Sequence, residues 1–284
     1  MHDSGNLRPI LVRLLAGRVG STLVMQLLST APEVAFDRVY PFENSYLTYL
    51  NRLIGQIAAP RPDGEDMFAF LYGDTTRVGP LPFSAQQLAA DAFARNSLLA
   101  VWQAFSMTMQ DTQASPARLY AEKYWGDVMP IMAAGLDPIV VDLVRDPRDV
   151  VASVRAINAK TGRQLFGREQ VQDDRQHLRS LVVGMGFRLQ EFSIQLPVAH
   201  LVIRYEDLVA DLPTEAARLQ DALGVVLDVE AVGAARPAMA HHMTSSSLDR
   251  SVGRWKHDLS ADETSAIERR LGAQMARLGY PLSS

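Results

Sequence analysis

The sequence predicts an α/β fold with a central parallel β-sheet flanked by helices. Five short runs of strand-forming residues are each followed by polar, Gly or Pro residues, and helical patterns lie between them. Strands that alternate with helices are typical of a parallel sheet that is covered on both faces. The predicted strands are Ile10–Leu15, Val34–Asp37, Arg118–Ala121, Pro138–Val144 and His200–Arg204.

The clearest helical pattern is an apolar stripe whose members recur at alternating steps of four and three residues. Such spacing places side chains on one helix face, so we interpret the stripe as core packing and not as a cofactor contact. Its members are Leu178, Val182, Met185, Leu189, Phe192 and Leu196. Further predicted helices are Ser21–Ser29, Ser84–Thr112, Pro213–Leu223 and Ala261–Leu278.

Length and composition predict a single domain over residues 1–284. The chain is 48% hydrophobic and 21% charged, which is enough apolar sequence for a sizeable core. Two loops predicted from composition, Ala59–Glu65 and Gly79–Pro82, are too short to divide it. The net charge of -4 argues against nucleic acid as a partner, so functional cations must be gathered locally.

The chain has no cysteine, which excludes disulfides, thiolate metal sites and cysteine nucleophiles. Its first apolar stretch is interrupted by Arg13 and Arg18 and lacks a basic leader, so we expect neither a signal peptide nor a membrane span. We therefore expect a cytoplasmic protein. The adjacent His241 and His242 are a poor metal pair by spacing, and no metal is predicted.

Gly17-Arg18-Val19-Gly20-Ser21-Thr22 lies where the first strand passes into a helix. Glycines allow a sharp turn and close approach to a ligand, and the helix N-terminus supplies unpaired N–H groups with partial positive charge. The pattern therefore predicts a site for a phosphate-like anion. The alternative is an ordinary strand-to-helix turn that Ser21 caps. The motif is not the nucleotide-triphosphate loop, which needs a Lys directly before Ser/Thr.

A second motif runs from Arg145 to Ser153. Asp146 is predicted to cap a helix whose first residue is Pro147, directly after the fourth strand. Arg145 then stands at the carboxyl end of that strand, which is the ligand edge of a parallel sheet, and Ser153 follows about two turns into the helix. A plain helix start explains Asp146 and Pro147 but not Arg145, so we expect a second anion site beside the first.

These motifs resemble those of the sulfotransferases that use 3′-phosphoadenosine 5′-phosphosulfate (PAPS). Arg18-Val19-Gly20-Ser21-Thr22 matches the family's loop for the 5′-phosphosulfate, and Arg145 to Ser153 matches the R-x-P-x-D-x-x-x-S motif for the 3′-phosphate. Two further stretches also resemble those of the family: Arg204-Tyr205-Glu206-Asp207-Leu208 and Ser251-Val252-Gly253-Arg254-Trp255-Lys256. The resemblance covers Ile10 to about Leu259 and implies the P-loop nucleotide-binding, sulfotransferase-like fold.

The chain departs from the cytosolic members of that family at two points. Leu23 replaces the tryptophan that stacks on adenine, and Leu248-Asp249-Arg250 replaces an R-K-G cluster. The sequence therefore looks closer to the carbohydrate and protein-tyrosine branch, as several bacterial members do. The resemblance makes Arg250 and Arg254 candidates for the 3′-phosphate and Tyr205 a candidate for adenine. With these, it implies a donor site of Arg18, Val19, Gly20, Ser21, Thr22, Leu23, Arg145, Ser153, Tyr205, Arg250 and Arg254.

Sulfuryl transfer needs positioning, charge stabilisation and a base for the acceptor proton. Glu43 follows the second strand, where the carbohydrate and tyrosine branch keeps its glutamate base, and Lys123 resembles the lysine of the family's E-K-T-P stretch after the third strand. We expect Glu43, Lys123 and Arg18 to be catalytic. The alternatives are a surface glutamate that opens a helix and a solvated lysine at a strand end.

The expected reaction moves a sulfuryl group from PAPS to an acceptor hydroxyl, or to an amine as the lesser choice, without a metal, and leaves 3′-phosphoadenosine 5′-phosphate (PAP). The acceptor is expected to be a small molecule or a group bound to a carrier. The acceptor-binding side of the site is expected to be formed by Tyr46–Ala58 and Met67–Arg77, with Phe68, Phe70 and Tyr72. The alternatives are an ATP-dependent phosphotransferase of the related P-loop fold and a non-catalytic module that binds PAP or PAPS.

Overall fold

The structure is a computed structural model that describes residues 6–37, 39–43, 45–57, 87–112, 117–234, 244 and 247–283. The chain forms two compact units. The first consists of residues 1–11 and 32–139, and the second of residues 12–31 and 140–284. The chain therefore leaves the first unit after the start of the first strand and enters it again at Pro32. The prediction of one domain over residues 1–284 stays a prediction.

The strands form a five-stranded sheet in the order β2-β3-β1-β4-β5. Their bounds are β1 Arg8–Leu14, β2 Val34–Phe36, β3 Leu119–Tyr124, β4 Ile139–Val144 and β5 His200–Arg204. β2 pairs with β3 in parallel, with Val34 opposite Leu119, and β4 pairs with β5 in parallel, with Val140 opposite His200. The predicted parallel α/β fold is confirmed, with all five strands close to their expected positions.

β3 is longer at its carboxyl end than the sequence predicted. We expected it to end at Ala121, but it continues through Glu122 and Lys123 to Tyr124, and every residue of the strand is buried. Lys123 therefore lies inside the strand and not after it. Charged residues lower strand propensity, which is why the local pattern hid this extension.

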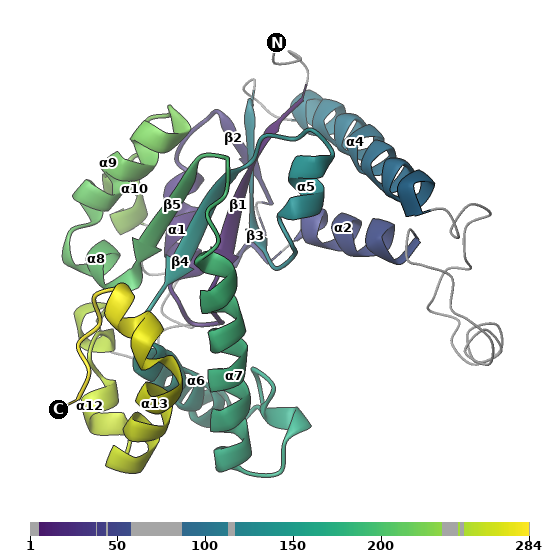
Figure 1. Ribbon diagram of the computed structural model, residues 1–284. Coiled ribbons are helices and arrows are strands. Elements are labelled where there is room, and N and C mark those ends of the chain that lie inside the picture. Colours follow the sequence, from purple (N-terminus) through teal and green to yellow (C-terminus); the bar gives the residue numbers. More distant parts are fainter. Residues whose placement is uncertain are drawn as a thin grey trace, which may run out of the picture. The chain divides into compact units, whose positions relative to one another are not determined.

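In the first unit, the core lies between β3 and the helices α2 (Tyr46–Ile57), α4 (Gln87–Thr112) and α5 (Met129–Ala133). α2 packs against α4 and β3, and α4 packs against α5 (Figure 1). The indole of Trp102 is fully buried, and its N–H donates a hydrogen bond of 2.9 Å to the carbonyl of Leu7. Phe105 stacks on this indole, with ring centroids 5.2 Å apart, so α4 is held by aromatic packing.

In the second unit, α13 packs against α6 and α7, and α8, α9 and α10 follow β5 (Figure 1). The described residues of this unit form the helices α1 Ser21–Leu28, α6 Pro147–Thr161, α7 Asp174–Phe192, α8 Tyr205–Ala210, α9 Leu212–Leu223, α10 Val229–Ala234, α12 Trp255–Asp258 and α13 Ala261–Arg277, with 3-10 turns η1 Arg168–Gln170 and η3 Asp249–Ser251. The predicted helices are thus present in the described residues, with ends that shift by a few residues; the first three residues of the predicted helix Ser84–Thr112 lie outside the described part.

The apolar stripe of α7 is one residue shorter than predicted. α7 ends at Phe192, so Leu196 lies beyond the helix, although its side chain is still buried. Pro197 follows Leu196 directly, and the residue before a proline is disfavoured in the helical conformation, so the helix could not have extended through Leu196.

An ionic cluster crosses the strands of the second unit. Asp142 on β4 is fully buried and accepts hydrogen bonds from Arg13 Nε and Nη2 on β1, at 2.6 and 2.7 Å. His200 Nε2 on β5 lies 2.7 Å from the same carboxylate. Asp142 therefore joins three neighbouring strands through side-chain contacts.

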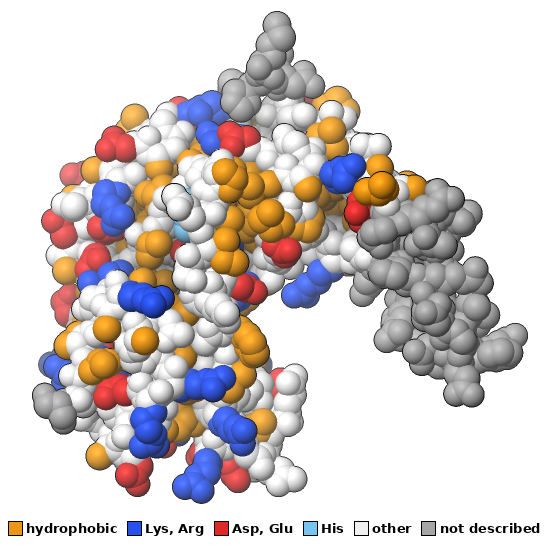
Figure 2. All heavy atoms as spheres, in the orientation of Figure 1, with side chains coloured by type: hydrophobic (Ala, Val, Ile, Leu, Met, Phe, Trp, Pro, Cys, Tyr) orange, Lys and Arg blue, Asp and Glu red, His pale blue; other side chains and the backbone are white. Residues whose placement is uncertain are grey.

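On the face drawn in Figure 2, positive and negative side chains are interspersed over the helices α8, α9 and α10. This mixture agrees with the low net charge of the chain. Among the described helices, none is long and apolar enough to cross a membrane.

Candidate functional site

The loop between β1 and α1 has the predicted strand, turn and helix geometry. Its backbone is left-handed at Arg18 (φ 71°) and at Gly20 (φ 88°), and α1 begins at Ser21. Gly20 caps the helix without a side-chain hydrogen bond, so the alternative in which Ser21 is the cap is wrong. The N–H of Leu23 donates to the carbonyl of Gly20 at 3.0 Å, whereas the N–H groups of Ser21 and Thr22 precede the first intrahelical bond and mark this helix end as a place for an anion.

The side chains of Val19 and Leu23 are buried in the core, with 0% and 4% of their surface exposed. Of the predicted donor residues, these two can therefore offer only backbone groups to a ligand at the loop. Ser21 and Thr22 are partly exposed at the start of α1. Their hydroxyls and N–H groups remain the polar contribution of this helix end.

Both glycines of the loop are in close contact with an aromatic ring. A Cβ atom on Gly20 would lie 2.3 Å from Cδ2 of Tyr205, and a Cβ on Gly17 would lie 2.2 Å from Cε1 of Phe166. Gly20 also needs its positive φ, which a residue with a Cβ adopts only with strain. The loop thus depends on glycine for two separate reasons.

The structure brings the two predicted anion motifs together. Arg18 Nε donates a hydrogen bond of 3.2 Å to Ser153 Oγ on α6, and Arg145 Nη1 donates one of 2.8 Å to the carbonyl of Arg18. These residues are separated by about 130 positions in the chain. Two cations and a hydroxyl therefore converge beside the N-terminus of α1.

Arg145 is held in place by the C-terminal part of the chain, and one of its three nitrogens has no hydrogen-bond partner. Only 3% of its surface is exposed, and its Nη2 donates to the carbonyl of Ser251 at 2.5 Å. Its guanidinium lies 4.5 Å from the ring centroid of Tyr205. Its Nε is buried without a hydrogen-bond partner. An unpaired buried donor on a cation is costly, and an anion would satisfy it.

Tyr205 is 5% exposed, and its hydroxyl shares a hydrogen bond of 2.8 Å with Ser251 Oγ. Arg254 is connected to Ser153 through Thr244, since Arg254 Nη1 donates to Thr244 Oγ1 at 2.9 Å and that hydroxyl lies 3.4 Å from Ser153 Oγ. Arg254 also forms an ion pair with Asp258. Arg250, by contrast, is exposed on η3.

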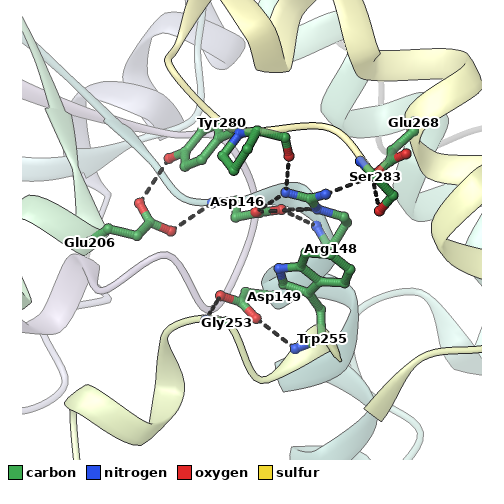
Figure 3. Close-up of polar contacts among 10 residues, drawn as sticks. Asp146, Arg148, Asp149, Glu206, Gly253, Trp255, Glu268, Tyr280 and Ser283 are labelled. Carbon is green, nitrogen blue, oxygen red and sulfur yellow. Dashed lines mark hydrogen bonds and ion pairs between the residues drawn. The ribbon is translucent and has the colours of Figure 1, made fainter. Parts of the chain in front are cut away.

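The sequence analysis assigned no role to Asp149, the aspartate of the R-x-P-x-D-x-x-x-S motif, which ties the C-terminal segment to α6 (Figure 3). Its carboxylate accepts the N–H groups of Gly253 and Trp255 at 2.7 and 2.9 Å. Burial raises the pKa of Asp149 to about 6, although these N–H groups and Arg145 act in the opposite direction. The carboxylate therefore fixes the turn that precedes α12, next to the Ser251 carbonyl that receives Arg145.

The predicted start of α6 is confirmed. Asp146 is the N-cap and accepts the N–H of Arg148, and Pro147 is the first helical residue. The side chain of Arg148, which the sequence did not single out, is fully buried and donates to Asp146, to Glu268 and to the carbonyl of Pro281 (Figure 3). This arginine binds the motif to the C-terminus of the chain and does not contribute to the anion site.

In the first unit, Lys123 and Glu43 form an ion pair of 2.5 Å, and Lys123 Nζ also donates to the carbonyl of Pro41 at 2.7 Å. Lys123 is 1% exposed, so its interpretation as a solvated lysine is wrong, while the Glu43 side chain is 61% exposed. Burial lowers the pKa of Lys123, and Glu43 opposes this shift. Glu43 does not open a helix, because α2 begins at Tyr46.

Part of the expected acceptor side is present in α2, which covers Tyr46–Ile57, whereas Ala58 and the stretch Met67–Arg77 lie outside the described residues, as do His241 and His242. Within the described part of the chain, no group of three or more His, Asp or Glu side chains is arranged to hold a metal ion.

Comparisons with known proteins agree with this architecture. A sequence profile described as the sulfotransferase family matches residues 15–228. A sulfotransferase domain from the olefin synthase of Synechococcus PCC 7002 is 18% identical, with a TM-score of 0.54 and coverage of 99% of this chain and 98% of that one. A sulfotransferase domain from the curacin biosynthetic pathway is 18% identical, with a TM-score of 0.50 over 98% and 100% of the two chains. No curated protein sequence matches this chain.

Proposed function

Because the chain belongs to the sulfotransferase family, we propose that it transfers a sulfuryl group from PAPS to an acceptor hydroxyl. An amine is the lesser choice of acceptor. The observation that carries the proposal is the convergence of Arg18, Arg145 and Ser153 beside the N-terminus of α1. This cluster combines two fixed cations with hydrogen-bond donors, and that chemistry suits a ligand with two anionic ends.

The residues of the second unit fit such a donor. Arg18, Ser21 and Thr22, with the N–H groups from Val19 to Thr22, are assigned to the 5′-phosphosulfate, because the Leu23 N–H already donates to the carbonyl of Gly20. Arg145 and Ser153 are assigned to the 3′-phosphate, with Arg250 and Arg254 as further candidates. The buried, unpaired Nε of Arg145 supports this assignment, because a phosphate oxygen would complete its hydrogen bonding. When bound, PAPS supplies the sulfuryl group.

The residues of the first unit supply the proton chemistry. Glu43 accepts the proton of the acceptor hydroxyl while the new O–S bond forms, and the proton stays on its carboxylate. Lys123 and Arg18 stabilise the negative charge that develops on the departing phosphate oxygen, and PAP leaves. The ion pair supports these roles, because it places the Glu43 carboxylate and the Lys123 ammonium 2.5 Å apart, where a base and a cation can act on one reacting group.

Two other functions are less well supported. An ATP-dependent phosphotransferase would need a Lys directly before Ser/Thr, whereas Val19 and Gly20 separate Arg18 from Ser21. A module that only binds PAP or PAPS would need no lysine buried against a carboxylate, as Lys123 is. The acceptor stays a small molecule or a carrier-bound group, and a reaction without metal in the cytoplasm stays our expectation.

The first test is calorimetric titration with PAP. Arg145→Ala should weaken PAP binding by roughly 10- to 100-fold, since it removes a charge-assisted contact from a buried site. Arg163→Ala is the matched control, because Arg163 is exposed on the loop after α6. Unchanged affinity in Arg145→Ala would remove the 3′-phosphate site from the proposal.

The second test is turnover with labelled PAPS in a screen of small hydroxyl acceptors. Glu43→Gln should bind PAP normally and lose on the order of 10²–10⁴ in turnover, because the amide cannot accept a proton. Glu169→Gln, an exposed glutamate on η1, serves as the control. Full activity in Glu43→Gln would assign the base to another residue.

A further inference from the structure

We propose that Glu122 is a positioning residue for the reaction, whose buried carboxylate fixes the segment that carries Glu43 and so holds Glu43 against Lys123. The inference rests on the proposed function and goes beyond it, because it names a group that contacts neither donor nor acceptor. Glu122 precedes Lys123 on β3 and is 1% exposed. Successive side chains of a strand point to opposite faces, so the two residues serve different sides of β3.

The carboxylate of Glu122 binds the first turn of α2. Its Oε2 accepts the N–H of Leu47 at 2.8 Å, and its Oε1 accepts the N–H of Thr48 at 3.0 Å and the Thr48 hydroxyl at 3.2 Å. These N–H groups belong to the helix end, which has no intrahelical acceptors for them and favours a negative charge. Glu122 therefore sets where α2 begins relative to β3.

The segment from Pro41 to Thr48 is bonded to β3 at both of its ends. Near its start, Lys123 Nζ contacts the Pro41 carbonyl and Glu43. Near its end, Glu122 holds the helix turn, and the hydroxyl of Ser45 donates to the carbonyl of Lys123 at 2.6 Å. The Glu43 side chain is 61% exposed, so these flanking contacts, and not burial of the side chain, set its position.

The charge state of Glu122 matters because only the ionised carboxylate accepts all three hydrogen bonds. Burial raises the pKa of Glu122 to about 7, and the donors at Leu47, Thr48 and Tyr120 lower it against burial. Tyr120 lies on the same strand, and Asp37 and Tyr46 act on Tyr120 in turn. β3 also carries Lys123, which is paired with Glu43, and Tyr124, and α2 also carries Tyr49 and Arg52.

Two opposite pH dependences follow. Because folding raises this carboxyl pKa above its ordinary value of 4.5, the native state binds more protons than the unfolded chain between about pH 4.5 and 7. The contribution of Glu122 to stability therefore falls as the pH rises through that window. Turnover should instead rise as the pH passes 7, because ionised Glu122 fixes the Glu43 segment.

The test compares wild type with Glu122→Gln, which keeps the shape and one carbonyl acceptor but cannot ionise. We expect about tenfold lower kcat and an unchanged Kd for PAP. The rise of kcat with pH near pH 7, which we call the limb of the pH profile, should be absent from Glu122→Gln. Hydrogen exchange at the amides of Leu47 and Thr48 should become about tenfold faster. Thr48→Val, which removes one donor to the carboxylate, should move the same limb to higher pH.

The exchange measurement keeps the two proposals separable, since it needs no turnover. If wild type shows no sulfotransfer but Glu122→Gln accelerates exchange at Leu47 and Thr48, the proposed function fails and the positional role of Glu122 stands. A Glu122→Gln variant with wild-type exchange, or with a limb still centred near pH 7, would overturn the inference. Glu169→Gln should match wild type in every measurement.

Discussion

Replacing Arg148 by methionine should destabilise the second unit by about 3 kcal/mol. The guanidinium donates to Asp146 at 2.6 Å, to Glu268 at 2.6 Å and to the carbonyl of Pro281 at 2.8 Å, and it lies 3.8 Å from the ring centroid of Trp255 (Figure 3). Removing one partner of a buried ion pair costs about 3–5 kcal/mol, because the other charge stays buried without compensation.

The lower end of that range applies because both carboxylates keep other donors. Asp146 still caps the N–H of residue 148, and Glu268 still accepts the N–H and hydroxyl of Ser283 at 3.0 and 2.9 Å. Urea unfolding followed by circular dichroism measures the loss, which corresponds to a Tm lower by about 6 °C. Arg163→Met, at an exposed position, should change stability by less than about 0.5 kcal/mol.

The pH dependence of this loss provides a second measurement. Burial raises the pKa of Glu268, but hydrogen bonds from Ser283 and Arg148 outweigh it, so the pKa lies below its usual range. The stabilisation is therefore present above the ordinary carboxyl pKa and is lost as the pH falls through the lowered one. The difference in the free energy of unfolding between wild type and Arg148→Met should become smaller below about pH 4. Equal urea midpoints at pH 7 would refute the reasoning.

Three further predictions concern the second unit. Gly20→Ala should lower the free energy of unfolding by at least about 1–2 kcal/mol from the left-handed backbone alone. It should also weaken PAP binding in calorimetry, because the new Cβ displaces Tyr205. Unchanged PAP affinity would contradict the geometry. Asp142→Asn should lower the free energy of unfolding by about 3–5 kcal/mol in urea, since it leaves Arg13 as an unpaired buried cation. An unchanged free energy of unfolding would mean that the Arg13–Asp142 ion pair does not stabilise the fold. Ser260→Ala removes the capping box of α13 and should cost about 0.5–2 kcal/mol in thermal unfolding without any effect on PAP affinity.

Local patterns in the chain were enough to predict the strands, the loop after β1 and the start of α6. Apolar runs broken by polar residues mark β4 and β5, and an Asp-Pro pair is a strong helix start, so Asp146 and Pro147 were placed correctly. The order of the motifs indicated the family. The strands, the loop and the helix start each depend on residues that are near one another in the sequence, where period and capping have direct local causes.

The partners of the charged residues were decided by tertiary structure alone. The burial of Lys123 against Glu43 joins positions 80 residues apart, and the carboxylate of Glu122 meets α2 across 74 or 75 residues. Arg145 likewise rests on Ser251, 106 residues further along. A lysine or glutamate has the same local pattern whether it is solvated or buried. Its role depends on which donors and acceptors the packed elements place around it, and that information exists only after the chain has folded.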